Sequence, residues 1–175
     1  MQNESSFRNF KSDLAQAGGF RAFLREQSIY PIAWYRVGRF LMSIKNRKIR
    51  RLVMTPYYFI FRFVELIFGI SLPPEAQIGG GLRIWHFGQI FINSGTIIGE
   101  GCTLRQNVTI GSKVADGAAP VIGNNVDIGA GAMIIGEINI GDNCRVGAMS
   151  LINKNVPCNT IAYGIPMEIK SREQK

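Results

Sequence analysis

The chain has 175 residues, 46% of them hydrophobic, which is enough to fill a core and excludes a largely disordered protein. Its formal net charge of +8 is placed unevenly, because residues 1–72 hold twelve Lys or Arg against four Asp or Glu whereas residues 73–175 hold eight of each. A neutral second half disfavours nucleic acid as a partner, since a protein that tracks phosphates needs a basic stripe along its binding surface.

The three cysteines, Cys102, Cys144 and Cys158, have neither the spacing of metal ligands nor the even count of a disulfide framework. Cys102 and Cys144 each lie two residues before a repeated aliphatic residue, where small inward side chains are expected. These features predict packed core cysteines in a reducing cytoplasm and no metal site. The polar stretch 1–13 predicts that no signal peptide opens the chain.

Residues 1–72 are predicted to form a small, basic and aromatic-rich α-helical region. Residues 1–17 are polar and are expected to fray. Apolar residues then recur at intervals of three and four in 20–28 and in 32–44, which predicts two helices, and Pro31 suits the start of the second helix.

A basic run at 45–51 precedes a long aromatic-rich segment, 52–72. The run is either a solvated helix end or a surface that faces a membrane or phosphate groups. Arg62 and Glu65 lie near the middle of the long segment, and because charges are costly at the bilayer centre, a helix packed on its neighbours is favoured over a spanning one. A helix on the membrane surface stays open, so residues 1–72 are a candidate for peripheral contact with anionic lipid.

Residues 73–175 are predicted to form a second domain, in which the sequence follows a six-residue period from Ile78 to Ile152. A branched aliphatic residue returns at every sixth position, with an offset of two after Ile90. The series is Ile78, Ile84, Ile90, Ile98, Leu104, Ile110, Ile122, Ile128, Ile134, Ile140, Val146 and Ile152. Such a period predicts a mainly β protein, a parallel β-helix of hexapeptide repeats in which each coil buries its inward row by stacking on its neighbours. Residues 113–120 break the pattern but keep its phase, which predicts a projecting loop, and a C-terminal tail ends the chain.

Candidate chemistry is concentrated on His86, the only histidine, two places after a repeat aliphatic. A lone histidine is commonly structural, so its position alone leaves that alternative open. The sequence contains no serine nucleophile elbow, no paired-histidine metal motif and no phosphate-binding glycine loop with lysine. His86 therefore has no rival as a catalytic residue.

The period and four segments together resemble the left-handed β-helix acyltransferases, and among them the serine acetyltransferase-like O-acetyltransferases of exopolysaccharide biosynthesis. The segments are IWHFG (84–88), CTLRQNVTIG (102–111), VIGNNVDIGAGAMIIGEINIGDN (121–143) and YGIPMEIK (163–170). The resemblance implies a left-handed coil, a homotrimer with active sites between subunits, and acetyl-CoA as co-substrate without a metal.

In such enzymes the histidine that corresponds to His86 is a general base. It removes the proton of an acceptor hydroxyl, which attacks the thioester of acetyl-CoA directly. Imidazole suits this role because it titrates near neutral pH, and a hydroxyl is a poor nucleophile until its proton is removed. The resemblance therefore implies that His86 later returns the proton to the leaving thiolate.

The expected acceptor site departs from that of the serine enzymes. The acidic residue that precedes their histidine corresponds to Trp85, and the arginine and histidine that help to bind serine correspond to Ala118 and Ala119. Trp85 and Phe87 suit the face of a sugar, although packing between subunits is an equal alternative. The resemblance thus favours a saccharide, lipid-linked or free, over serine.

The carboxylate that orients the histidine in the family corresponds to Ser71. Glu75 or a main-chain carbonyl is the candidate replacement, which adds Ser71 and Glu75 to the acceptor side of the predicted site.

For the coenzyme, the resemblance points to a groove lined by small residues that let the pantetheine arm lie close to the backbone. They are Gly111, Ser112, Ala130, Gly131 and Ala148. Lys154 and Lys170 are candidates for its phosphates, with solvated lysines as the alternative.

The sequence leaves three alternative functions open. The first is an acetyl-CoA-dependent O-acetyltransferase that acts on exopolysaccharide, capsule or a lipid-linked glycan in the cytoplasm, at the inner face of the cell membrane if the helices bind lipid. The second is serine O-acetyltransferase. The third is a non-catalytic β-helix scaffold, because a fold alone does not prove an activity.

Overall fold

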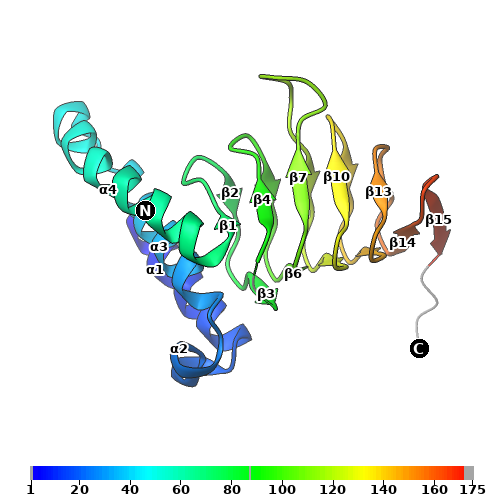
Figure 1. The fold of residues 1–175 in the computed structure, drawn as a ribbon, viewed down its shortest axis with the longest axis horizontal. Helices are drawn as coiled ribbons and strands as arrows, with labels where there is room; N and C mark the ends of the chain where they lie inside the picture. The colour runs from blue at the N-terminus through cyan, green and yellow to red at the C-terminus, as the bar shows by residue number, and fades with distance from the viewer. Residues whose placement is uncertain (1, 87, 172–175) are drawn as a thin grey trace.

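The computed structural model describes residues 2–86 and 88–171, and its helices are gathered at one end of an elongated β-solenoid (Figure 1). The helices are α1 (Gln2–Gln16), α2 (Ala22–Arg25), α3 (Ile29–Met42) and α4 (Arg47–Phe68), with a short 3-10 turn, η1 (Gly19–Arg21), before α2. The two helices predicted within 20–28 and 32–44 correspond to η1 with α2 and to α3. Within the described residues no helix has both the length and the hydropathy to cross a bilayer.

The first helix, α1, is anchored by a buried ion pair, so the expectation of a frayed segment at 1–17 is wrong. The Asp13 carboxylate is fully buried and accepts from the Arg36 guanidinium of α3 at 2.8 Å. It also accepts from the Leu82 backbone N–H at 2.8 Å, while Arg36 donates to the Ile78 carbonyl at 2.7 Å. A single carboxylate therefore joins α1, α3 and the first coil of the solenoid.

Helix α3 covers the open end of the solenoid. The Tyr35 hydroxyl donates to the Ala76 carbonyl at 2.8 Å and accepts from the Ile78 N–H at 3.0 Å. Ile32 and Tyr35 belong to the same buried cluster as the repeat aliphatics, and burial raises the pKa of Tyr35. A repeat array needs such a cap because its terminal coil otherwise exposes an apolar row.

Helix α4 has a capping residue at each end. The Asn46 side chain accepts from the backbone N–H groups of Lys48 and Ile49 at 3.0 and 3.2 Å. Gly69 ends the helix in the left-handed conformation, with φ of 62°, and its N–H donates to the Glu65 carbonyl at 2.8 Å.

The strands form three sheets, which are the three faces of the solenoid. Sheet A contains β1 (Ile70–Ser71), β4 (Ile90–Ile92), β7 (Thr109–Gly111), β10 (Met133–Ile135) and β13 (Leu151–Ile152). Sheet B contains β2 (Gln77–Ile78), β5 (Ile97–Ile98), β8 (Val121–Ile122) and β11 (Asn139–Ile140). Sheet C contains β3 (Arg83–Trp85), β6 (Thr103–Arg105), β9 (Asp127–Ile128), β12 (Arg145–Val146), β14 (Thr160–Tyr163) and the antiparallel β15 (Glu168–Ser171). The parallel β-helix predicted from the period is confirmed, and the loop between β7 and β8 projects from it (Figure 1).

The core consists of the predicted inward rows. Every member of the aliphatic series is buried, and so are Cys102 and Cys144, whereas Cys158 is exposed. The prediction of two core cysteines is therefore confirmed, and burial raises the pKa of the Cys102 thiol to about 11.

The two-residue offset lies earlier than the sequence series suggested. Ile84 is the partner of Leu104, and Ile92, not Ile90, is the partner of Ile110. Ile84 and Ile92, which pair with successive aliphatics of the next coil, are therefore eight positions apart in the sequence instead of six. The two additional residues fall in the turn between β3 and β4, which carries His86.

One corner of the solenoid is a stack of glycines that follow the strands of sheet B, namely Gly79, Gly99, Gly123 and Gly141. A Cβ built on Gly79 would lie 2.7 Å from the backbone nitrogen of Glu100 and 2.7 Å from the carbonyl carbon of Gly99. Backbone atoms of an adjacent coil cannot move aside as a flexible side chain can, so this corner tolerates no side chain.

We expect Gly79→Ala to lower the free energy of unfolding by about 1–3 kcal/mol, because the new methyl group overpacks the coil boundary. Thermal and urea unfolding followed by circular dichroism measure the change. Gly111→Ala is the matched control, since its Cβ would approach no atom closer than the Ile135 Cδ1 at 3.8 Å. Equal stability of the two variants would contradict the proposed role of the glycine stack.

Candidate functional site

The corner between sheets C and A forms a continuous ridge, which we call the C/A ridge. Backbone hydrogen bonds join its successive turns: Asn107 N–H to the Gly88 carbonyl at 3.1 Å, Gly131 N–H to the Gln106 carbonyl at 2.9 Å, and Met149 N–H to the Ala130 carbonyl at 2.8 Å. The ridge therefore brings four predicted site residues into one line, His86, Ala130, Gly131 and Ala148.

The backbone at the start of the ridge is unusual. His86 has φ of 57° and Gln89 has φ of 53°, and Gly88 between them has φ of 116°. Positive φ is uncommon for residues other than glycine and clusters at functional sites. Gln89 shares its positive φ with Asn107 and Met149 in the regular turns of the ridge, so the positive φ of His86 is what distinguishes this turn. The His86 side chain is exposed. Phe87, which the sequence assigns to the acceptor site, lies outside the described residues.

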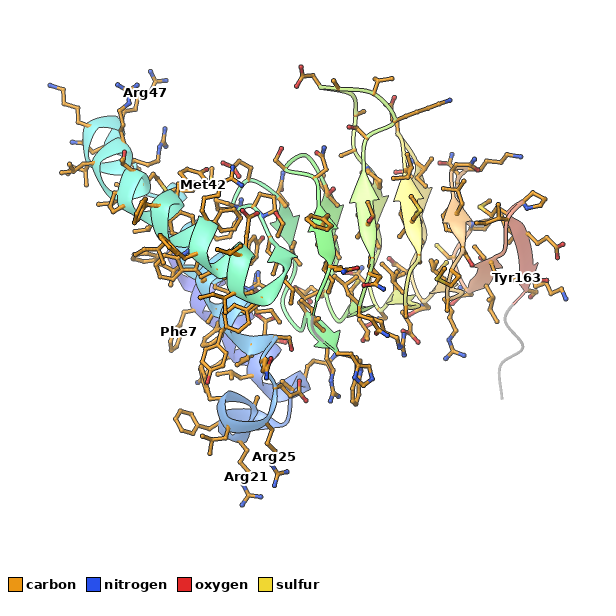
Figure 2. The ribbon with its side chains drawn as sticks, in the orientation of Figure 1. Phe7, Arg21, Arg25, Met42, Arg47 and Tyr163 are labelled. Carbon is orange, nitrogen blue, oxygen red and sulfur yellow. The ribbon has the colours of Figure 1, made fainter. Side chains whose placement is uncertain are left out.

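The pocket beside His86 has a volume of 320 Å³, at the lower end of the range of small-molecule sites in proteins. Its walls come from two parts of the chain: residues 25–28 of the helical region, and Ile84, Trp85 and His86 of the solenoid. Arg25, at the end of α2, is labelled in Figure 2. The Ser28 hydroxyl donates to the Ile84 carbonyl at 2.9 Å, which holds the two walls together.

Trp85 is supported by a cationic side chain from its own strand. The guanidinium carbon of Arg83 lies 3.6 Å from the centre of the indole ring, and Arg83 forms an ion pair of 3.3 Å with Glu26. The indole remains 41% exposed beside the imidazole of His86, with 6.4 Å between ring centres. Arg83 and Glu26 were not predicted from the sequence, because neither lies in a motif and only the fold brings residues 25–28 to this strand.

Ser71, which corresponds to the family carboxylate that orients the histidine, and Glu75, its candidate replacement, both bond to α4. The Ser71 hydroxyl of β1 donates to the carboxylate of Glu65 in α4. Glu75 accepts from the Tyr58 hydroxyl of α4, and burial together with this hydrogen bond raises the pKa of Tyr58. Within the described residues, no hydrogen-bond partner of the His86 imidazole is present, so its orientation rests on the strained turn and on Trp85.

The remaining coenzyme candidates lie away from the C/A ridge. Gly111 and Ser112 are at the next corner, where the Gly136 N–H donates to the Gly111 carbonyl at 2.9 Å, and the exposed Lys154 follows β13 at the same corner. A second pocket, of 500 Å³, lies under the projecting loop between Lys113, Ala118, Gly136 and Asn153. Lys170 is on β15 at the far end of the solenoid, and its hydrogen bond with Tyr163 raises the pKa of the ammonium group. One protomer thus divides these residues between two corners and a distant strand.

The described residues contain no cluster of three or more His, Cys, Asp or Glu side chains that would hold a metal ion. The C/A ridge offers an imidazole for proton transfer, next to an aromatic wall and to small residues. The three-sheet solenoid and its six-residue period together define a hexapeptide-repeat β-helix protein.

Comparison with known proteins identifies the family. A family model described as bacterial transferase hexapeptide (six repeats) matches residues 119–154. The putative colanic acid biosynthesis acetyltransferase WcaB of Escherichia coli K12 is 34% identical over 139 residues, which cover 78% of this chain and 86% of WcaB. The chain therefore belongs to the hexapeptide-repeat acetyltransferases, in the group that contains WcaB and the serine acetyltransferases.

The serine acetyltransferases are longer relatives. That of Synechococcus elongatus is 31% identical over 159 residues, which cover 90% of this chain and 62% of the relative, and that of Buchnera aphidicola is covered to 50%. The solved Neisseria gonorrhoeae serine acetyltransferase in complex with serine has a TM-score of 0.82 at 25% identity, covering 96% of this chain and 70% of that one. A serine acetyltransferase solved in complex with CoA has a TM-score of 0.81 at 25% identity, covering 96% and 71%.

Proposed function

We propose that this protein is an O-acetyltransferase that moves the acetyl group of acetyl-CoA to a hydroxyl of a saccharide, in an exopolysaccharide, a capsule or a lipid-linked glycan. The observation that carries the proposal is His86, exposed on a strained turn beside Trp85 and a pocket of 320 Å³. A histidine packed for structure alone would be expected to be buried and hydrogen-bonded.

The proposed reaction proceeds by direct attack. His86 accepts the proton of the acceptor hydroxyl while the oxygen bonds to the thioester carbonyl carbon. The tetrahedral intermediate then collapses, the carbon–sulfur bond breaks, and the imidazolium returns the proton to the CoA sulfur. Backbone N–H groups at the coil corners are the available donors for the oxyanion.

For the coenzyme we propose the small residues of the C/A ridge and the neighbouring corner, which are Ala130, Gly131, Ala148, Gly111 and Ser112. Support comes from the relative solved with CoA and from the small size of these side chains. Lys154 and Lys170 remain candidates for the coenzyme phosphates.

A saccharide is favoured as acceptor by two observations. WcaB, whose name refers to colanic acid, is covered by this chain to 86% of its length, whereas the first serine acetyltransferases are covered to 62% and 50%. An indole that is 41% exposed at the pocket suits the apolar face of a sugar ring, whereas Ser71 and Glu75 bond to α4 and do not line this pocket. Serine O-acetyltransferase is the second candidate, because solved relatives of that activity share the fold.

We further propose a homotrimer, with a coenzyme groove completed between subunits, working in the cytoplasm, where thiols such as Cys102 and Cys144 stay reduced. The separation of the coenzyme candidates over two corners of one protomer supports a shared groove, because a neighbouring subunit would bring the second corner to the ridge of the first.

Light scattering coupled to size-exclusion chromatography should give about three times the protomer mass of 19.4 kDa, since the proposed groove needs adjacent subunits. The measurement is made at several protein concentrations. A stable monomer that retains full activity would refute the shared groove.

Replacing His86 should abolish the chemical step while leaving the coenzyme bound. We choose His86→Asn, because asparagine tolerates positive φ and the turn is then preserved. kcat is expected to fall by about 10²- to 10⁴-fold, the usual contribution of a general base, with the affinity for CoA unchanged in calorimetry. A variant that keeps more than about a tenth of wild-type kcat would exclude His86 as the base.

The acceptor is identified by incubating the protein with acetyl-CoA and either candidate glycans or L-serine, and by measuring released CoA chromatographically. We expect CoA release with a saccharide only, and Trp85→Ala should raise the KM of that saccharide by about 2- to 10-fold through loss of the aromatic wall, with the KM of acetyl-CoA unchanged. Trp85→Phe is the matched control that keeps an aromatic face. Faster turnover with L-serine would establish the second candidate instead.

A further inference from the structure

Helix α4 presents an apolar surface to the outside of the molecule. Five large side chains form it, and we call them the outer face of α4: Leu52, Phe59, Phe63, Leu66 and Ile67. Their exposed fractions lie between 48% and 81%, and the Phe59 and Phe63 rings pack edge to face at 5.1 Å. The spacing of three, four and seven residues places all of them on one side of the helix.

The opposite side of α4 already has its partner. Met54, Tyr57 and Phe61 are buried in a cluster with Trp34, Leu41 and Met42 of α3. A helix that is apolar on both sides is normally buried on both sides, and a contiguous exposed patch of this kind marks an interaction surface. The outer face is therefore unoccupied by the chain itself.

The surroundings of the outer face are basic. Lys48 lies four residues before Leu52 on the same side of the helix, and Arg51 and the exposed Arg62 flank that side. Arg47, at the end of α4 farthest from the solenoid, points away from the rest of the molecule (Figure 2).

The acidic side chains described in the helical region offset only part of this charge. Asp13 is paired with the buried Arg36 and Glu26 with Arg83, whereas Glu65 is paired with Arg62, so Lys48 and Arg51 supply the net positive charge of the border. The outer face thus combines apolar side chains with a cationic border, which is the composition of a helix that lies in a membrane interface.

We propose that the outer face of α4 docks the protein on an anionic lipid surface, with the helix in the plane of the interface. The apolar side chains enter the acyl boundary, and Lys48 and Arg51 meet the negatively charged headgroups. A second copy of the chain is disfavoured as the occupant, because pairing two such faces would bring two cationic borders together. This inference does not depend on the proposed acetyl transfer.

The test is co-sedimentation of the full-length protein with vesicles of phosphatidylcholine containing phosphatidylglycerol, and with vesicles of phosphatidylcholine alone. We expect binding to the mixed vesicles that weakens as salt is raised, and little binding to the neutral ones. Lys48→Gln with Arg51→Gln should weaken binding by about tenfold or more. Leu66→Ser with Ile67→Ser should weaken it by a similar factor or more, at unchanged circular dichroism, because both side chains are exposed.

Two variants on the solenoid are the matched controls, and both should bind like the wild type. Lys113→Gln with Lys154→Gln removes the same charge, and Val114→Ser removes an exposed apolar side chain. Binding that is equal for neutral and anionic vesicles, absent from both, or insensitive to the α4 variants would overturn the proposal. A fall in oligomer mass of Leu66→Ser with Ile67→Ser, with vesicle binding intact, would instead assign the outer face to contact between copies of the chain.

Discussion

The close stacking of one coil on the next is the constraint on which the rest of the structure depends. Parallel strands in one sheet lie about 4.8 Å apart, so backbones that meet at a corner have little room for a side chain between them. At Gly79 a Cβ would already be 2.7 Å from the neighbouring backbone. The strict period follows from this, since each coil has to repeat both the inward aliphatic and the tight corner of the previous one.

A scaffold held in such strict register can carry chemistry only where the register is relaxed. The turn between β3 and β4 contains two residues more than a regular repeat, and its His86 adopts positive φ. The segment between Gly111 and Val121 is the other relaxation, and it projects from the solenoid (Figure 1). The first lies at the corner that leads into sheet A, and the second lies at the corner that leaves it. One of the two pockets described above lies at each corner.

The repeat architecture was predictable from the sequence because a period of six is a local signal, present at every coil. The role of His86 stays a prediction, which rests on its being the only histidine of the sequence, and the structure adds that its side chain is exposed beside a pocket. The buried Asp13–Arg36 pair was not, since an aspartate in a polar stretch gives no indication that a fold will bury it against α3 and Leu82. The role of residues 25–28 as a wall of the His86 pocket was missed for the same reason, because it depends on where a helical region docks and not on any pattern within it.

The docking of the helical region links the interior of the solenoid to both surfaces of interest. The Tyr35 hydroxyl of α3 is hydrogen-bonded to Ala76 and Ile78 of the first coil. Ser28, the residue before α3, is hydrogen-bonded to Ile84 beside the pocket. The other side of α3 packs on Tyr57 of α4 through Trp34, with their ring centres 5.2 Å apart. The outer face of α4 and the pocket of His86 are therefore parts of one connected body, in which the side chains that close the core of the first coil also fix the position of both surfaces.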